Sequence, residues 1–171
     1  IIQLTEGSKN ANLCNEQQEK VRDDLLRSHV WNFAAKRTKL SRLVETPSFG
    51  FAYYYQLPSD FLRSVSIHPD SAGTGTTPYK IEGRKVLSDA GDIYLRYIYK
   101  VTDPNEMDAQ FRETFAWALA VDLAIPITQS NSMRQEMRDG LRGQLSKAKS
   151  VDAIEDYPES EPASNWITER L

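Results

Sequence analysis

The residues best suited to chemistry in this chain gather in the stretch His-Val-Trp-Asn-Phe-Ala-Ala-Lys-Arg, residues 29–37. His29 could act as a general base only if a partner lay within hydrogen-bond reach, and the sequence alone supplies none. The second histidine, His68, precedes Pro69 in a segment typical of a loop. We therefore interpret both histidines as capping or surface residues.

A basic run follows this stretch and could contact phosphate groups, while Trp31 and Phe33 could stack on bases. The aromatic residues precede the charges, however, and do not alternate with them. This order favours a basic edge that faces protein, with the aromatic side chains in the core. The basic run consists of Lys36, Arg37, Lys39 and Arg42.

The sequence contains no G-x-S-x-G, H-E-x-x-H or paired Cys/His signature. One cysteine and two histidines disfavour a zinc site. Residues 73–79, "GTGTTPY", lack the Gly-Lys-Ser/Thr of a phosphate loop and indicate a flexible connection. We expect no catalytic residue, cofactor or metal, although a glycosidase-type carboxylate pair stays open as an alternative. The candidate carboxylates are Asp89, Asp92, Asp103, Glu106 and Asp108.

Composition places the chain among ordinary globular domains. Its 171 residues are 40% hydrophobic and 26% charged, which allows one packed core. The net charge of −3 argues against a general nucleic-acid-coating protein. Residues 20–42 hold seven bases and two acids, whereas residues 152–161 hold five acids and no base. We expect a soluble intracellular protein, because no run approaches the roughly 18 apolar residues of a membrane helix and the single cysteine needs no oxidising compartment.

Periodicity in the first half predicts one helix followed by strands. Residues 11 to about 28 carry a narrow apolar stripe, with Asn10 as the expected N-cap. Residues 49–55 and 94–99 alternate in the manner of half-buried strands, and residues 79–82 and 85–87 form a hairpin around Gly83. Residues 71–78 are typical of a loop. The helical stripe consists of Cys14, Gln17, Val21 and Leu25.

The second half predicts a helical hairpin. Asp103 is the expected N-cap, Pro104 suits the first turn, and Pro126 should end the first helix. A second helix follows after about five residues. Gly140 and Gly143 weaken it by up to ~1 kcal/mol each unless close packing requires them. Its core-facing row consists of Met133, Met137, Leu141 and Leu145.

These elements predict an α+β fold, a helical bundle with a small inserted antiparallel β-sheet and an extended C-terminal tail. The expected divisions are residues 1–46, the N-terminal lead and first helix; 47–101, the β insertion; 102–150, the helical hairpin; and 151–171, the arm. The arm is rich in proline and acids, yet it carries apolar side chains that suit an interaction. These are Trp166, Ile167 and Leu171.

Four segments, taken in order, resemble a known family. They are Trp31-Asn32-Phe33-Ala34; Gln56-Leu57-Pro58; residues 79–89 with Glu82-Gly83; and Asp103-Pro104 leading to Phe111. Over nearly the whole chain, the sequence is similar to the head–tail connector (adaptor or gatekeeper) proteins of short-tailed phages and related prophages, the tail tubular protein A family. Relatives carry a further helix before the point at which this sequence starts.

The resemblance implies a structural role in a virion. Family members form a ring of about a dozen copies below the portal, extend the DNA channel and dock the tail nozzle, and the duplex passes without sequence recognition. It also implies a place at the head–tail junction, after assembly in the host cytoplasm, with no membrane partner. Two alternatives remain: a tail-associated glycan hydrolase, and a standalone nucleic-acid-binding module.

The resemblance also suggests roles for particular residues. Trp31, Asn32 and Phe33 would form a structural elbow between the first helix and the sheet. Subunit or portal contacts would come from the basic run and from the arm. The expected interface residues are Lys36, Arg37, Lys39, Arg42, Tyr157, Trp166, Ile167 and Leu171.

Overall fold

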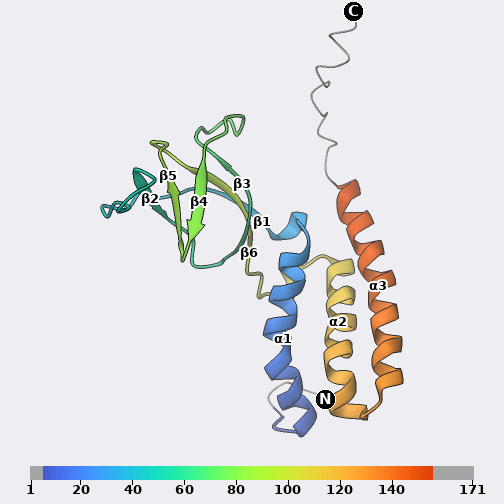
Figure 1. The fold of residues 1–171 in the computed structure, drawn as a ribbon. Coiled ribbons are helices and arrows are strands. Elements are labelled where there is room, and N and C mark those ends of the chain that lie inside the picture. The colour runs from blue at the N-terminus through green and yellow to red at the C-terminus, as the bar shows by residue number, and fades with distance from the viewer. Residues whose placement is uncertain (1–5, 156–171) are drawn as a thin grey trace, which may run out of the picture.

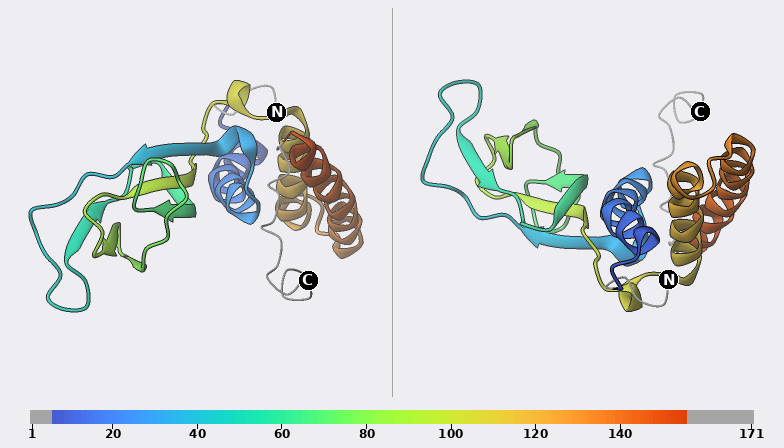
Figure 2. Two further views of the ribbon diagram at one scale, coloured as in Figure 1. Left: turned by 90° about the horizontal axis from the view of Figure 1, so that it is seen from above. Right: turned by 90° about the horizontal axis from the view of Figure 1, so that it is seen from below.

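The computed structural model describes residues 6–155 and consists of a three-helix bundle beside a β half (Figure 1). The helices are α1 (Lys9–Ser28), α2 (Ala109–Thr128) and α3 (Asn131–Ile154). Helix α2 packs against both α1 and α3. Views along the bundle show that the β half projects to one side of it (Figure 2).

The β half contains two antiparallel three-stranded sheets, of order β1-β6-β3 and β2-β5-β4. The predicted α+β class is therefore confirmed. The strands are β1 (Ala35–Lys39), β2 (Tyr53–Gln56), β3 (Phe61–His68), β4 (Tyr79–Glu82), β5 (Lys85–Ser88) and β6 (Tyr94–Tyr99).

Two apolar cores account for this arrangement. One joins the helices to the start of the β half and includes Leu26, Trp31, Ile98 and Phe111. The other is built from both sheets and includes Tyr55, Val86 and Leu95. Successive residues of β6 point to opposite faces of the sheet, so this strand contributes Ile98 to the first core and Leu95 to the second. Strand β6 thereby connects the two halves.

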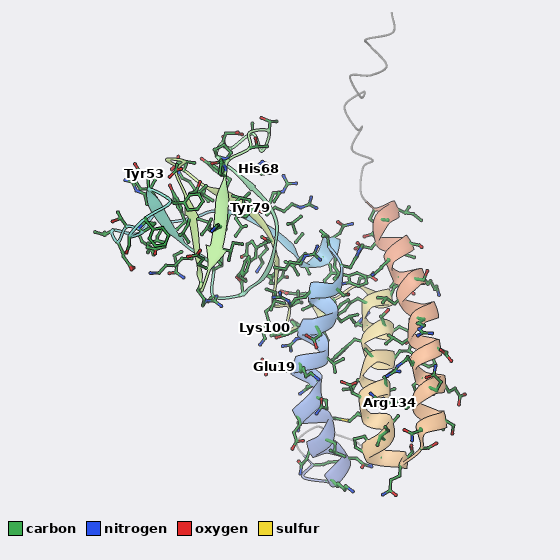
Figure 3. All side chains as sticks on the ribbon, viewed as in Figure 1. Glu19, Tyr53, His68, Tyr79, Lys100 and Arg134 are labelled. Carbon is green, nitrogen blue, oxygen red and sulfur yellow. The ribbon has the colours of Figure 1, made fainter. Side chains whose placement is uncertain are left out.

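An ion-pair cluster also connects the halves. Lys100, just after β6, lies 3.2 Å from the Asp23 carboxylate and also pairs with Glu19 of α1 (Figure 3). These groups are partly exposed, so their contribution to stability is small. The cluster joins the residue after β6 to α1.

The predicted helix starts need correction. Helix α1 begins two residues early because Ser8, not Asn10, is its N-cap, and the Ser8 hydroxyl accepts the Ala11 N–H at 3.2 Å. Asp103 caps only a 3₁₀ turn, Pro104–Glu106. Helix α2 starts after Asp108, whose carboxylate accepts the N–H groups of Gln110 and Phe111.

The predicted helix ends also change. Pro126 lies inside α2, which continues to Thr128 and closes with Gln129 in the left-handed region. Only two residues of α2 follow Pro126, so the lost hydrogen bond and any local distortion affect the end of the helix alone. The loop to α3 is accordingly shorter than predicted. Helix α3 runs to Ile154, into the segment expected to be an extended arm.

The strand predictions were right in part. The hairpin of β4 and β5 is confirmed, with Gly83 at φ +58° in its turn. Phe49 was assigned to a strand but is 87% exposed in a loop that contains Gly50 at φ +87°. Strands β1 and β3 were not predicted, and β1 extends the sheets into residues assigned to the helical lead.

Candidate functional site

The elbow residues lie where the chain leaves α1 and enters β1. Trp31 is 1% exposed, and its Nε1–H donates to the Leu25 carbonyl at 3.0 Å. The ring meets Phe111 of α2 edge-on, with centroids 5.1 Å apart, and Phe33 meets the same ring at 4.9 Å. Aromatic pairs of this kind add ~0.5–1.5 kcal/mol to stability, beyond what the burial of their apolar surface contributes. Trp31 and Phe33 therefore fasten the end of α1 to α2.

Asn32 takes part in a polar contact with Asp152 near the end of α3. The Asn32 N–H donates to Asp152 Oδ1 at 2.9 Å, and its Nδ2 donates to the Asp152 carbonyl at 2.8 Å. His29 Nε2 lies 3.0 Å from the other carboxylate oxygen. Both oxygens of this buried carboxylate are thus used, and the three residues join the elbow to α3. Sequence reasoning missed Asp152, because nothing local to it indicates a partner 120 residues away.

Three of the four basic residues already have partners in the chain. Lys36 Nζ lies 3.3 Å from Asp60 Oδ2 and 3.4 Å from the centroid of the Tyr99 ring. Lys39 Nζ lies 2.8 Å from Asp92 Oδ2. The Arg42 guanidinium lies over the Tyr53 ring, 4.7 Å from its centroid. These contacts hold the basic run against the β half, and the role of the run in subunit contact stays a prediction.

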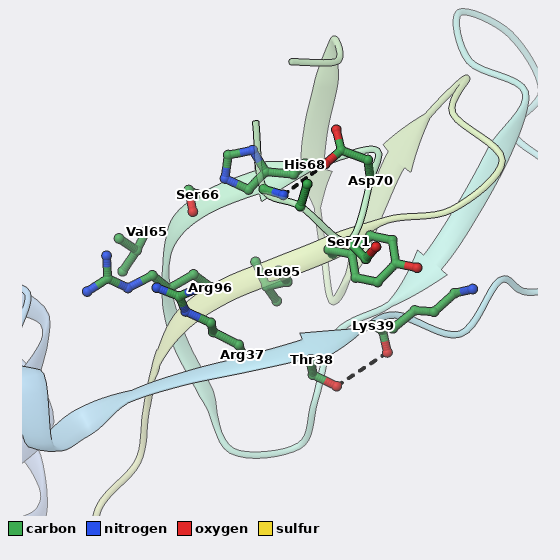
Figure 4. Close-up of a pocket in the computed structure, with 13 residues that line it drawn as sticks. Arg37, Thr38, Lys39, Val65, Ser66, His68, Asp70, Ser71, Leu95 and Arg96 are labelled. Atoms are coloured by element: carbon green, nitrogen blue, oxygen red, sulfur yellow. Dashed lines mark hydrogen bonds between the residues drawn. The ribbon is translucent and has the colours of Figure 1, made fainter. Parts of the chain in front are cut away.

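Arg37 is the exception. It lies directly opposite Arg96 in the pairing of β1 with β6. Within residues 6–155, neither guanidinium makes a hydrogen bond or ion pair. Both line an open depression of about 720 Å³, together with Ser66, His68 and Ser71 (Figure 4).

The loop beside this depression is organised by Asp70. Its carboxylate accepts the N–H groups of Gly73 and Gly75, each at 2.8 Å. His68 Nδ1 lies 2.9 Å from the Gly75 carbonyl and donates to it. No helix or strand forms over residues 71–78, as predicted. The only acid of the loop is therefore occupied by the loop's own backbone.

Exposed apolar side chains form a separate group of candidate contacts. Val44 and Phe49 lie in the loop between β1 and β2, at 102% and 87% exposure. Ile125, Ile127 and Met133 lie where α2 turns into α3, and we call these three residues the hairpin tip. The prediction that Met133 lies in the core is therefore wrong, whereas Leu145 does pack against the helical core.

The carboxylates considered for a glycosidase pair each hold local structure. Asp103 and Asp108 cap helical turns, as described above. Asp89 accepts the Ala52 N–H at 2.8 Å, and Glu106 accepts the Tyr99 hydroxyl at 3.0 Å. Asp92 pairs with Lys39. Across residues 6–155, no group of three or more His, Cys, Asp or Glu side chains is arranged to hold a metal ion.

Tyr157, Trp166, Ile167 and Leu171 lie outside the described residues. Within those residues, none of the helices has the length and apolar character needed to span a bilayer.

Comparison with known proteins found no family model that matches the chain and no curated protein with significant similarity to it.

Proposed function

We propose that this chain is a subunit of a phage or prophage head–tail connector. In this role, about a dozen copies form a ring below the portal, extend its DNA channel and present a docking surface for the tail. The motif order described above supports the proposal, as does a helical bundle with a laterally projecting β half. The observation that carries it, however, is the character of α2.

Helix α2 is apolar on nearly every side, yet only five of its 20 residues are buried in the single chain. Ile125 and Ile127 are 37% and 45% exposed. A helix that is apolar all round is normally enclosed by protein. Helices α1 and α3 cover two sides of α2, and a neighbouring subunit in a ring would cover the remainder. A ring contact joins different patches of adjacent subunits. Each copy would therefore cover the exposed side of α2 in one neighbour and have its own α2 covered by the other neighbour.

The charge distribution suits a bore through which DNA slides. Many free cations would hold phosphate groups and slow the duplex. Lys36 and Lys39 are instead paired with Asp60 and Asp92, and the chain carries a net charge of −3. The field of a ring of such subunits would be negative. We therefore place the basic run away from the bore.

The decisive experiment measures particle mass in solution with and without isolated portal rings from a short-tailed phage. We expect the protein to assemble on the portal into a particle that contains about a dozen copies. A chain that stays monomeric and ignores every portal tested would contradict the proposal. Glycan hydrolysis by the pure protein would support the enzyme alternative instead.

Deletion of residues 157–171 tests the part assigned to the arm. The described fold ends before this segment, so the shortened chain should keep its folded spectrum and unfolding midpoint. We expect it to bind portal rings poorly, because Trp166, Ile167 and Leu171 are absent. Trp166→Ala should show part of the same loss. If both variants bind portal rings as well as the original chain does, the arm takes no part in portal binding.

A further inference from the structure

Arg37 and Arg96 form an unusual pair, because like charges directly opposite each other destabilise a sheet. Strands normally place an acid or a neutral residue at such a position. Within the described residues no acid neutralises the pair, which leaves two guanidinium groups beside one depression. A partner that supplies negative charge would turn this repulsion into a binding site.

The surroundings of the pair suit an oxyanion. The hydroxyl-bearing side chains of Ser66 and Ser71 line the same depression. Asp70 also lines the depression, but its two carboxylate oxygens accept backbone N–H groups of the loop, and Asp92 is paired with Lys39. Two guanidinium groups can grip carboxylates through paired N–H donors, a geometry that lysine cannot provide.

We propose that the Arg37–Arg96 pair binds the acidic segment of the chain's own C-terminal arm, residues 156–161. This segment contains Asp156, Glu159 and Glu161 and no basic residue. The ligand is thus an acidic peptide, held in cis by two arginine side chains. This contact forms within a single chain and requires neither a ring nor a portal.

Chain length permits this contact. Asp152 is fixed 2.9 Å from the Asn32 N–H, at the point where the chain turns into β1. Arg37 follows Asn32 by five residues, a span of at most ~18 Å. Glu159 follows Ile154, the last residue of α3, by five residues, which can span ~17 Å. The arm therefore starts within reach of the depression.

The direction of the side chains agrees with this route. Arg37 and Arg96 extend side by side, away from the far end of the sheet and toward the side where β1 joins the helices (Figure 4). Helix α3 ends on that same side, because Asp152 contacts the elbow. A tethered segment reaches millimolar effective concentration, so even weak carboxylate contacts would be occupied.

A DNA phosphate backbone offers a similar anion, but the charges around the pair favour the arm. Each chain has one acidic segment, which follows α3 in the sequence, and the end of α3 contacts the elbow before β1. The neighbouring cations that would extend a phosphate track are already paired. Lys36 and Lys39, which flank Arg37 on β1, contact Asp60 and Asp92. DNA binding is therefore an outcome that the experiment must be able to reveal.

The test uses the full chain labelled with ¹⁵N and a spin label on Ser160→Cys, in a Cys14→Ala background. We expect the label to broaden the backbone amide signals of Thr38, Ser66 and Arg96. The broadening should be lost in Arg37→Gln/Arg96→Gln and persist in Arg134→Gln/Arg138→Gln, a charge-matched change on α3. It should also fade at about 0.5 M salt, where the Debye length is only a few ångströms.

A second variant keeps the result interpretable if the arginine changes disturb the fold. Asp156→Asn/Glu159→Gln/Glu161→Gln leaves the depression intact and should also remove the broadening. No broadening in the original chain, or broadening that survives both sets of changes, would overturn the proposal. So would broadening that occurs only between differently labelled chains, or a short DNA duplex that occupies the depression while the label has no effect.

Discussion

The carboxylate of Asp152, near the end of α3, accepts a hydrogen bond from the backbone N–H of Asn32 at 2.9 Å. Its second oxygen lies 3.0 Å from His29 Nε2. This contact joins the last turn of α3 to the elbow between α1 and β1. One buried side chain thereby holds the end of α3 at the point where the chain enters the β half.

Asp152→Ala should lower the free energy of unfolding by ~1–3 kcal/mol, because the Asn32 N–H and His29 both lose their acceptor in a buried setting. Urea denaturation measures the change. Asp139→Ala is the matched control, since the contacts of Asp139 with Gln135 and Arg142 are exposed and their loss should cost little. Equal effects of the two substitutions would contradict the structural role of Asp152.

The two glycines of α3 should respond to alanine with opposite signs. A Cβ at Gly140 would lie 2.3 Å from the Trp117 ring, whereas a Cβ at Gly143 meets nothing within 4 Å. Gly140→Ala should therefore destabilise by ~1–3 kcal/mol through overpacking. Gly143→Ala should stabilise by ~0.5–1 kcal/mol, because alanine is the better helix former. Urea midpoints of both variants test this, and stabilisation by Gly140→Ala would show that the ring moves freely.

Local patterns in the sequence predicted the three helices and the β4–β5 hairpin, because apolar spacing and turn chemistry act over a few residues. Strand β3 escaped notice for a physical reason. Register shifts between Phe61 and Arg63, and between Ser64 and Ser66, break the alternation that marks a strand. Strand β1 was hidden by its basic composition, since its lysines are stabilised by partners in distant segments.

The candidate site was less predictable than the fold. The aromatic residues of the elbow could be chosen from sequence, since large apolar groups beside a helix end are rarely left in water. The polar contact of the elbow could not be predicted from sequence, because the pairing of Asn32 with Asp152 depends on how α1 and α3 are placed in space. The opposition of Arg37 to Arg96 depends in the same way on strand register, which no local pattern of this sequence specifies.

The unfolding free energy should fall between pH 10 and 12. Burial, with the hydrogen bond to Asp60, raises the pKa of Tyr97 to about 12. An unfolded tyrosine ionises near pH 10, so between these values the unfolded chain binds fewer protons and folding weakens as pH rises. Tyr97→Phe should flatten this decline, although Tyr55 and Tyr99, whose pKa values burial also raises, leave some slope.

The matched control for this effect is Tyr79→Phe, which removes a hydroxyl from a tyrosine that is 42% exposed on β4. Denaturant midpoints are compared across the same pH range for both variants and the original chain. The decline with pH should be smaller in Tyr97→Phe than in Tyr79→Phe. If Tyr97→Phe keeps the full slope, then Tyr97 does not carry the alkaline decline.

Substitution at the hairpin tip separates folding from assembly. Ile127 is 45% exposed, so Ile127→Ser should change the unfolding free energy of the single chain by no more than ~0.5 kcal/mol. In a ring, however, the same side chain would lie against a neighbour, and its replacement would leave a hydroxyl in an apolar contact. We expect particle mass measurements with portal rings to show fewer complete rings for this variant. Val44→Ser, an equally conservative change in the loop before β2, tests whether the effect belongs to the tip. Normal assembly of Ile127→Ser would mean that the apolar surface of α2 is not what joins the subunits.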